Sequence, residues 1–142
     1  MTTVQQLLDQ KGPDIYCVHP DDMVLDALKM MKNEDVGSVL VKEGDRLVGI
    51  FTERHYARNV FLKGRSSPKT PIRDVMKTKV ICVAPEQTVD VCMALMTEKR
   101  VRHLPVLRGE QLVGVISIGD LLKNVISDQK FTIEQLEHFI RS

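Results

Sequence analysis

The sequence of 142 residues has no excess of charge of one sign, because 20 Lys and Arg stand against 19 Asp and Glu, a formal net charge of +1. Such a chain has no global electrostatic attraction for nucleic acid or for an anionic membrane, so we expect neither as a partner. Long hydrophobic runs are also missing, since the longest, such as 112–116, fall far short of the roughly 20 residues that span a bilayer. The first ten residues lack the basic start and apolar stretch of a signal peptide, which predicts a cytoplasmic location.

The motifs of common catalytic and metal sites are missing as well. The three cysteines, Cys17, Cys82 and Cys92, form no C-x-x-C pair, and no cluster of His and Cys has the spacing of metal ligands. No G-x-S-x-G motif, Walker loop or G-x-G-x-x-G motif occurs. We therefore expect no metal, no catalytic cofactor and no enzymatic activity, and we expect the cysteines to be buried apolar residues.

What the sequence does contain is an internal repeat. A shift of 65 positions aligns I-Y-C-V-H-P-D-D-M-V (15–24) with V-I-C-V-A-P-E-Q-T-V (80–89). The same shift, without a gap, aligns R-L-V-G-I-F-T (46–52) with Q-L-V-G-V-I-S (111–117). Most pairs that are not identical exchange one apolar residue for another, so we infer two copies of one unit.

Each copy has the pattern of a β-α-β-β-α unit. Short β-rich runs at 15–18 and 80–83 end before Pro20 and Pro85, as strands that meet a proline do. The apolar positions that follow fall at i, i+4 and i+7, which predicts an amphipathic helix in each copy. Apolar runs at 38–41 and 104–107 are each followed by a charged, glycine-containing tetrapeptide and an L-V-G segment, which predicts a hairpin.

Further helices are expected around these units. Thr52 and Ser117 carry hydroxyls suited to N-caps, so a second helix should follow each hairpin, to about residues 60 and 126. Thr70 and Pro71 predict a short lead-in helix at 72–76, and residues 4–8 should play the same part for the first copy. Thr132 with Gln135 forms a capping-box pattern that predicts a separate final amphipathic helix.

The predicted organisation is therefore a first repeat with its lead-in helix at 3–62, a linker at 63–71, a second repeat at 72–127 and a C-terminal helix at 128–142. A unit of about 50 residues cannot bury its apolar sheet face alone. We therefore expect an α/β (α+β) fold in which the two repeats pack face to face about a pseudo-twofold axis. Such packing creates two related clefts, each walled by the backbone of a first strand and the start of a final helix.

The tandem unit resembles a pair of CBS (cystathionine β-synthase) domains. The resemblance rests on L-V-G-V-I-S-I-G-D (112–120) and R-V-R-H-L-P-V (100–106), and it covers roughly residues 3–127. Since we expect no attached enzyme, channel or transporter domain, the chain is similar to the small stand-alone bacterial CBS-pair proteins. The resemblance implies a non-catalytic module that binds adenosine-containing ligands such as AMP, ADP, ATP, NAD or S-adenosylmethionine, and a homodimer shaped as a flat disc.

The second copy holds the stronger candidate site. Ser117 lies three residues before Asp120 at a predicted strand-to-helix junction, so both side chains and the free N–H groups of the helix start should face one pocket. A hydroxyl and a positive helix end suit phosphate, and a carboxylate can accept from both ribose hydroxyls. The resemblance makes Asp120 the ribose ligand and Ser117 a phosphate ligand. The alternative is that Ser117 only caps the helix and Asp120 only interacts with the helix dipole.

The first copy departs from this pattern, since Thr52 takes the serine position but His55 stands where the family has Asp. A neutral imidazole has one acceptor nitrogen and cannot hold a ribose diol from both oxygens. Near phosphates, a protonated His55 would make affinity rise as the pH falls through about 6 to 7. Alternatively, the site has decayed. Arg54 and Arg58 could reach phosphates or could be ordinary surface residues.

Arg102 and His103 precede the second predicted hairpin, and the resemblance implies that this pair contacts phosphate, for which a guanidinium beside an imidazole is well suited. The alternative is a cross-strand salt bridge, and the sequence does not indicate which cleft the pair faces. The adenine is expected along the first strands, at Ile15, Tyr16 and Val18 in one cleft and at Val80, Ile81 and Val83 in the other.

Two classes of function follow. The first is a regulatory module that binds an adenine nucleotide between its repeats and signals occupancy to a client protein of unknown identity by a population shift. The second is an interaction or assembly subunit with degenerate clefts, whose working surface lies on the lead-in and C-terminal helices.

Overall fold

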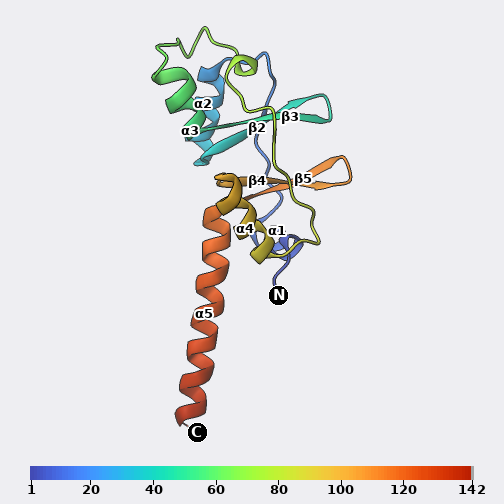
Figure 1. Cartoon of the computed structure of the whole chain (residues 1–142), viewed down its shortest axis with the longest axis vertical. Coiled ribbons are helices and arrows are strands. Elements are labelled where there is room, and N and C mark those ends of the chain that lie inside the picture. The colour runs from blue at the N-terminus through green and yellow to red at the C-terminus, as the bar shows by residue number, and fades with distance from the viewer. Residues whose placement is uncertain (142) are drawn as a thin grey trace.

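The computed structural model describes residues 1–141 and contains two small sheets, one in each repeat, which lie one above the other in Figure 1. In the first sheet, β1 (Cys17–Val18) pairs in parallel with β2 (Ser38–Glu43), and β2 pairs with β3 (Arg46–Thr52) as an antiparallel hairpin. The second sheet is the hairpin of β4 (His103–Arg108) and β5 (Gln111–Ser117). The α/β class and both predicted hairpins are confirmed.

The helix that follows each first strand is also confirmed. These helices are α2 (Val24–Glu34) and α4 (Val89–Lys99). The first and last residues of each predicted stripe are buried, Val24 and Met31 in α2 and Val89 and Met96 in α4, whereas Leu28 is half-buried and Met93 is 37 % exposed. Both end at a residue in the left-handed region, Asp35 with φ 54° and Arg100 with φ 55°. Cys92 is fully buried in α4, whereas Cys17 and Cys82 are half-buried.

The first strand of the second repeat is the main difference between the two sheets. We expected a strand at 80–83, but only one parallel bridge forms, between Val83 and Val106. In the first repeat, Leu40 N donates to Tyr16 O at 2.9 Å. The position equivalent to Leu40 is Pro105, which has no N–H, so the corresponding bond to residue 81 cannot form.

The helices after the hairpins differ in length. In the first repeat, α3 (Glu53–Tyr56) continues into the π-helical turn η1 (Ala57–Phe61). In the second repeat, α5 (Ile118–Arg141) is one helix of 24 residues that projects away from the two sheets in Figure 1. The prediction of a separate final helix capped by Thr132 is wrong, because no Gly or Pro between 120 and 141 interrupts the helix.

The two lead-in segments pack crosswise. Val4, Leu7 and Leu8 of α1 (Val4–Lys11) belong to the core of the second repeat. Ile72 of η2 (Ile72–Asp74) belongs, with Val75, to the core of the first. The expectation that residues 4–8 serve the first repeat is therefore wrong: each lead-in segment crosses to the other repeat.

Equivalent hydrogen bonds fix both crossings, as a pseudo-twofold relation requires. Val4 N donates to Gln87 O at 2.8 Å, and Ile72 N donates to Asp22 O at 2.8 Å. The next residue in each segment repeats the match, because Gln5 N and Arg73 N donate at 2.9 Å to the carbonyls of Pro85 and Pro20.

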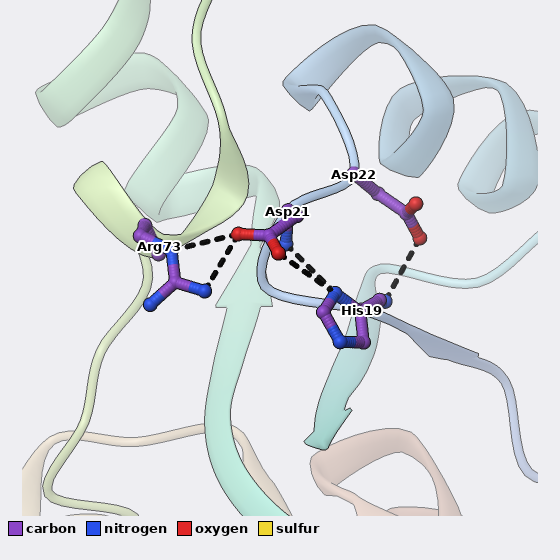
Figure 2. Close-up of polar contacts among 4 residues, drawn as sticks. All are labelled: His19, Asp21, Asp22 and Arg73. Carbon is purple, nitrogen blue, oxygen red and sulfur yellow. Dashed lines mark hydrogen bonds and ion pairs between the residues drawn. The ribbon is translucent and has the colours of Figure 1, made fainter. Parts of the chain in front are cut away.

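Side chains reinforce the crossing at the first repeat (Figure 2). Arg73 Nε and Nη2 donate to Asp21 Oδ1 at 2.9 and 2.6 Å. His19 Nδ1 accepts from Asp21 N at 3.0 Å, and His19 N donates to Asp22 Oδ2 at 2.8 Å. Because these side chains are about half exposed or more, we assign the cluster to local positioning of the lead-in segment, with a small effect on stability.

Candidate functional site

Ser117 and Asp120 form a reciprocal hydrogen-bonded pair at the junction of β5 and α5. Ser117 N donates to Asp120 Oδ2 at 2.8 Å, and Asp120 N donates to Ser117 Oγ at 3.2 Å. This is the geometry of a capping box, so both residues satisfy donors at the start of α5. The capping role that was the alternative in the sequence is therefore real, and any ligand contact has to be made in addition to it.

Asp120 also has a cationic partner that the sequence did not indicate. Lys11, in the last turn of α1, places its Nζ 2.7 Å from Asp120 Oδ2 and 2.8 Å from Val115 O. Both bonds to the carboxylate end on Oδ2, so within residues 1–141 Oδ1 accepts no hydrogen bond. The Asp120 side chain is 18 % exposed.

The charge state of Asp120 follows from these contacts. Burial raises the pKa of the carboxyl, but the hydrogen bonds from Lys11 and Ser117 outweigh burial, and the pKa lies below its ordinary value. The site therefore offers an ionised carboxylate at neutral pH, with one oxygen held and the other open.

Thr52 and His55 reproduce this arrangement in the first repeat with different chemistry. Thr52 N donates to His55 Nδ1 at 3.2 Å, and His55 N donates to Thr52 Oγ1 at 3.3 Å. The acceptor nitrogen of the neutral ring is thus used by the cap, and the other nitrogen, Nε2, carries the proton. The imidazole can therefore donate to an anionic group but cannot accept from a ribose hydroxyl.

Positive charge around His55 opposes its protonation. Burial lowers its pKa, and Lys77, Arg54 and Arg58 lower it further. In the ligand-free protein the imidazole therefore titrates below its ordinary range, rather than between pH 6 and 7 as the sequence suggested.

His103 lies on the boundary between the repeats. A methyl group placed on Gly37 of the first repeat would lie 3.5 Å from His103 Nε2 and 3.1 Å from Glu53 Oε1. Burial lowers the pKa of His103 to about 4, and Lys11 is the strongest of the charges that add to this effect. His103 is therefore neutral at pH 7 and supplies hydrogen bonds but no charge to a phosphate.

Three arginines meet at a separate pocket of about 190 Å³ between α4 and the start of α5. Arg54 reaches it from the first repeat and donates through Nη1 to Arg100 O at 3.1 Å, and Arg102 completes the set. Arg54 and Arg102 were candidate phosphate ligands from the sequence, whereas Arg100, the first residue of the R-V-R-H-L-P-V segment, was not expected at a site. The apolar wall comes from Met93, Met96, Val101, Ile118, Leu121 and Leu122.

This pocket does not unite all the predicted ligand residues. Ser117, Asp120, His55 and His103 do not line it, and neither does Arg58. The structure thus separates an Arg-rich pocket from the polar notch, by which we mean the Asp120 carboxylate with Ser117, Lys11 and His103.

Some residues of the two segments predicted to bind the adenine are used by the cores and the sheets instead. Val18 and Val83 are buried in the two cores, so their side chains cannot line an open cleft. Val83 N donates to Pro105 O, and Val83 O accepts from Leu107 N. The four other positions, Ile15, Tyr16, Val80 and Ile81, are half-buried.

Two broader features bear on the kind of site. Across residues 1–141, no three or more His, Cys, Asp or Glu side chains are grouped so that they could hold a metal ion. In the same part of the chain, no helix combines the length and the apolar character needed to cross a membrane.

Comparisons with known proteins agree with the repeat. The sequence model of the CBS domain matches residues 11–61 and 72–127. The chain is 37 % identical over 150 residues to the mitochondrial CBS domain-containing protein CBSX3 of Arabidopsis thaliana, covering 99 % of this chain and 72 % of that protein. It is 30 % identical to CBS domain-containing protein YhcV of Bacillus subtilis, covering 85 % and 86 %.

A solved structure is similar over most of its length. It is a candidate signal-transduction protein with CBS domains from Burkholderia ambifaria, 53 % identical in sequence, with a TM-score of 0.87 and coverage of 90 % of this chain and 96 % of that one.

Proposed function

This chain belongs to the CBS domain family, as a tandem pair of such domains, and on that premise we propose that it is a regulatory module that binds an adenosine nucleotide (AMP, ADP, ATP or NAD(H)) between its repeats and signals occupancy to a partner protein. The observation that carries the proposal is the ionised Asp120 carboxylate, held by the backbone through Oδ2 while Oδ1 accepts no hydrogen bond from residues 1–141. A fixed carboxylate with a free oxygen suits the two hydroxyls of a ribose.

The phosphate groups would be bound by different residues. Arg54, Arg100 and Arg102 gather on one pocket, and guanidinium groups match phosphate in charge and geometry. Ser117 remains a proposed phosphate ligand through its hydroxyl, and Arg58 and Thr52 remain proposed contacts in the first repeat. The backbone at residues 15–16 and 80–81 stays the proposed place of the adenine.

Lys11 gives the proposed site a way to signal. A ribose has two hydroxyls, so one can donate to the open Oδ1 of Asp120 while the other competes with the Lys11 ammonium for Oδ2. Release of Lys11 would loosen the end of α1, which packs in the core of the second repeat. The ligand would thus favour one position of α1 over another, and the shift can be no larger than its differential affinity for the two states.

A second candidate function, an interaction or assembly subunit that binds no nucleotide, is favoured by the same ion pair. Lys11 places a side chain in the polar notch, and Ser117 and Asp120 already have a capping role. Under either function we propose a homodimer and a client protein, and a cytoplasmic location stays a prediction, since one relative is mitochondrial.

A ligand panel separates the two candidates. Thermal unfolding would be followed with AMP, ADP, ATP, NAD and NADH, with adenosine and inorganic phosphate as controls for the two halves of the ligand. Ligand at 100 times its Kd stabilises by about 2.7 kcal/mol, which raises Tm by roughly 5 to 10 °C for a chain of this size. A nucleotide-sensing module gives such a shift with at least one nucleotide. No shift with any of them at millimolar concentration supports the assembly subunit instead.

A further inference from the structure

The distal part of α5 is an apolar surface that the chain itself does not cover. Near its start the helix contacts α4, β5 and α1, and Leu121 is fully buried there. From residue 126 to 140 every side chain is exposed. In Figure 1 this part of α5 extends well beyond the rest of the protein. Large apolar residues nevertheless recur along it, among them Ile133, which is 54 % exposed, and Leu136, which is 58 % exposed.

These apolar residues follow a strict spacing. One set alternates steps of four and three residues along the helix, and we name it the α5 seam: Leu122, Ile126, Gln129, Ile133, Leu136 and Ile140. At about 100° per residue the six positions fall within about 80° of the helix circumference. The seam is about 27 Å long at 1.5 Å per residue. Two large apolar side chains lie outside this stripe, Phe131 on the opposite side of the helix and Phe139 about 100° from the seam.

The residue types within the seam point to a second copy of the same helix. In heptad notation, Ile126, Ile133 and Ile140 take the a positions, and Leu122 and Leu136 take d positions. Isoleucine at a with leucine at d favours two parallel strands. We propose that two copies of this chain pair through the α5 seam as a parallel two-stranded coiled coil.

The polar residue of the seam agrees with the parallel direction. Gln129 occupies the remaining d position. In a parallel pair it faces Gln129 of the second copy, and the two side-chain amides can hydrogen-bond to each other. In the antiparallel pair of equal overlap, Gln129 would face an isoleucine and lose its hydrogen bonds on burial, which is unfavourable.

The residues that flank the seam permit this pairing. In the parallel arrangement, Val125 lies against Lys130 of the second copy, and Thr132 lies against Glu137, so no like charges face each other.

Charge argues against a lipid surface as the occupant. The sequence of α5 contains four acidic residues, Asp120, Asp128, Glu134 and Glu137, against three basic ones, Lys123, Lys130 and Arg141. An amphipathic helix that binds an anionic membrane is rich in Lys and Arg on its polar face.

The seam also continues onto the body of the protein. Leu122 lines the Arg-rich pocket together with Ile118 and Met93, which are 42 % and 37 % exposed.

Sedimentation equilibrium of the full chain, without nucleotide, tests the pairing. The unmodified chain is expected to be a dimer at micromolar concentration. Ile133→Glu should raise the dimer dissociation constant at least about 100-fold, because it places a charge in the buried seam of both copies. Phe131→Glu, the matched change on the outer face, should leave the constant within about threefold. Because both side chains are exposed in one chain, neither change disturbs a core, and circular dichroism should show both variants folded. Ile133→Glu should also lower Tm, because it loses the stabilisation that association supplies.

Disulfide cross-linking under mild oxidation tests the direction. Leu136→Cys should form a covalent dimer, because a d position faces itself in a parallel pair, whereas Lys130→Cys should not. The unmodified chain measures the background from its own cysteines. The proposal is overturned if the chain is monomeric at 100 times the protein concentration used in the assay, if the dimer survives Ile133→Glu, or if Lys130→Cys cross-links faster than Leu136→Cys.

Discussion

At the scale of single residues, Asp120 and His55 show how one exchange makes two equivalent positions different. Each completes a cap at the start of the helix after its hairpin, with backbone donors at 2.8 and 3.2 Å. Asp120 has a second carboxylate oxygen that can still accept a hydrogen bond, whereas the neutral imidazole of His55 has no second acceptor. Because a ribose needs an acceptor, we expect one nucleotide per chain, at Asp120.

Replacing this histidine should create the second site. In His55→Asp, the new carboxylate would take the Thr52 cap and offer its free oxygen, as Asp120 does. Isothermal titration with the best nucleotide from the panel should then give close to two sites per chain instead of one. His55→Asn, which has a neutral side chain with one carbonyl acceptor, is the control and should still give one site. A single site in His55→Asp would show that the first cleft is closed for another reason.

His103 predicts a specific pH dependence of stability. Its pKa is lowered from an ordinary 6.5 to about 4 in the folded chain. The folded state therefore favours the neutral ring, and the stability that results is present above pH 6.5 and is lost as the pH falls toward 4. Between pH 7 and 5 the loss amounts to up to about 2 kcal/mol.

Urea unfolding of the unmodified protein and of His103→Gln at pH 7, 6 and 5 measures this loss. The variant should lose less stability over the same interval, because glutamine does not titrate. Identical pH slopes for the two proteins would contradict a buried neutral His103.

At the scale of elements, the sequence predicted what repeats locally and missed what depends on distant contacts. The two hairpins and the helices α2 and α4 follow from spacing within 30 residues, and they are present. Pro105 has no N–H and so cannot form the hydrogen bond that would pair residue 81 with β4. The sequence of 80–83 alone does not show this, because the proline lies in the partner strand. A capping box forms only where the chain enters a helix from a non-helical conformation. Thr132 lies inside the continuous helix α5, so its pattern does not mark a helix start.

The crossing of the lead-in segments was equally hidden from local patterns. Lys11 reaches Asp120 across 109 positions, so no motif could have marked it. The glycine of each L-V-G segment did carry a signal, because a residue without a side chain permits a close approach. In the structure that approach is made by the lead-in segments: a methyl group on Gly114 would lie 2.5 Å from Leu8 Cδ2, and one on Gly49 would lie 2.6 Å from Met76 Sδ.

Gly114→Ala should therefore loosen the contact between α1 and the second repeat. We expect a loss of about 1 to 3 kcal/mol in urea unfolding, the usual cost of overpacking. Gly119→Ala is the control, because its nearest neighbour would be Ser117 Oγ at an ordinary 3.5 Å, and it should lose little or no stability. Shortening the opposing side chain in Gly114→Ala/Leu8→Val should lower the cost of the alanine relative to its cost beside Leu8. Additive effects would show that α1 does not press on Gly114.

At the scale of the whole molecule, the crossed lead-in segments join the two repeats into one unit. Each core contains residues from both halves of the chain, so neither repeat is complete without the segment that precedes the other. The polar notch lies at the end of the lead-in helix α1, because Lys11, which binds Asp120, is the last residue of that helix. A ligand at Asp120 would thus act on a contact that helps to hold the repeats together.

Isothermal titration of the unmodified chain, Asp120→Ala and Asp128→Ala with AMP, ADP, ATP and NAD tests the central claim most directly. Asp128 lies on the same helix and is exposed, so its loss matches the change in charge. Hydrogen bonds to a charged group contribute roughly 1.5 to 3 kcal/mol, so Asp120→Ala should weaken nucleotide binding at least about tenfold, whereas Asp128→Ala should not. Equal affinities for the unmodified protein and Asp120→Ala, with circular dichroism showing both folded, would contradict a ribose held at Asp120.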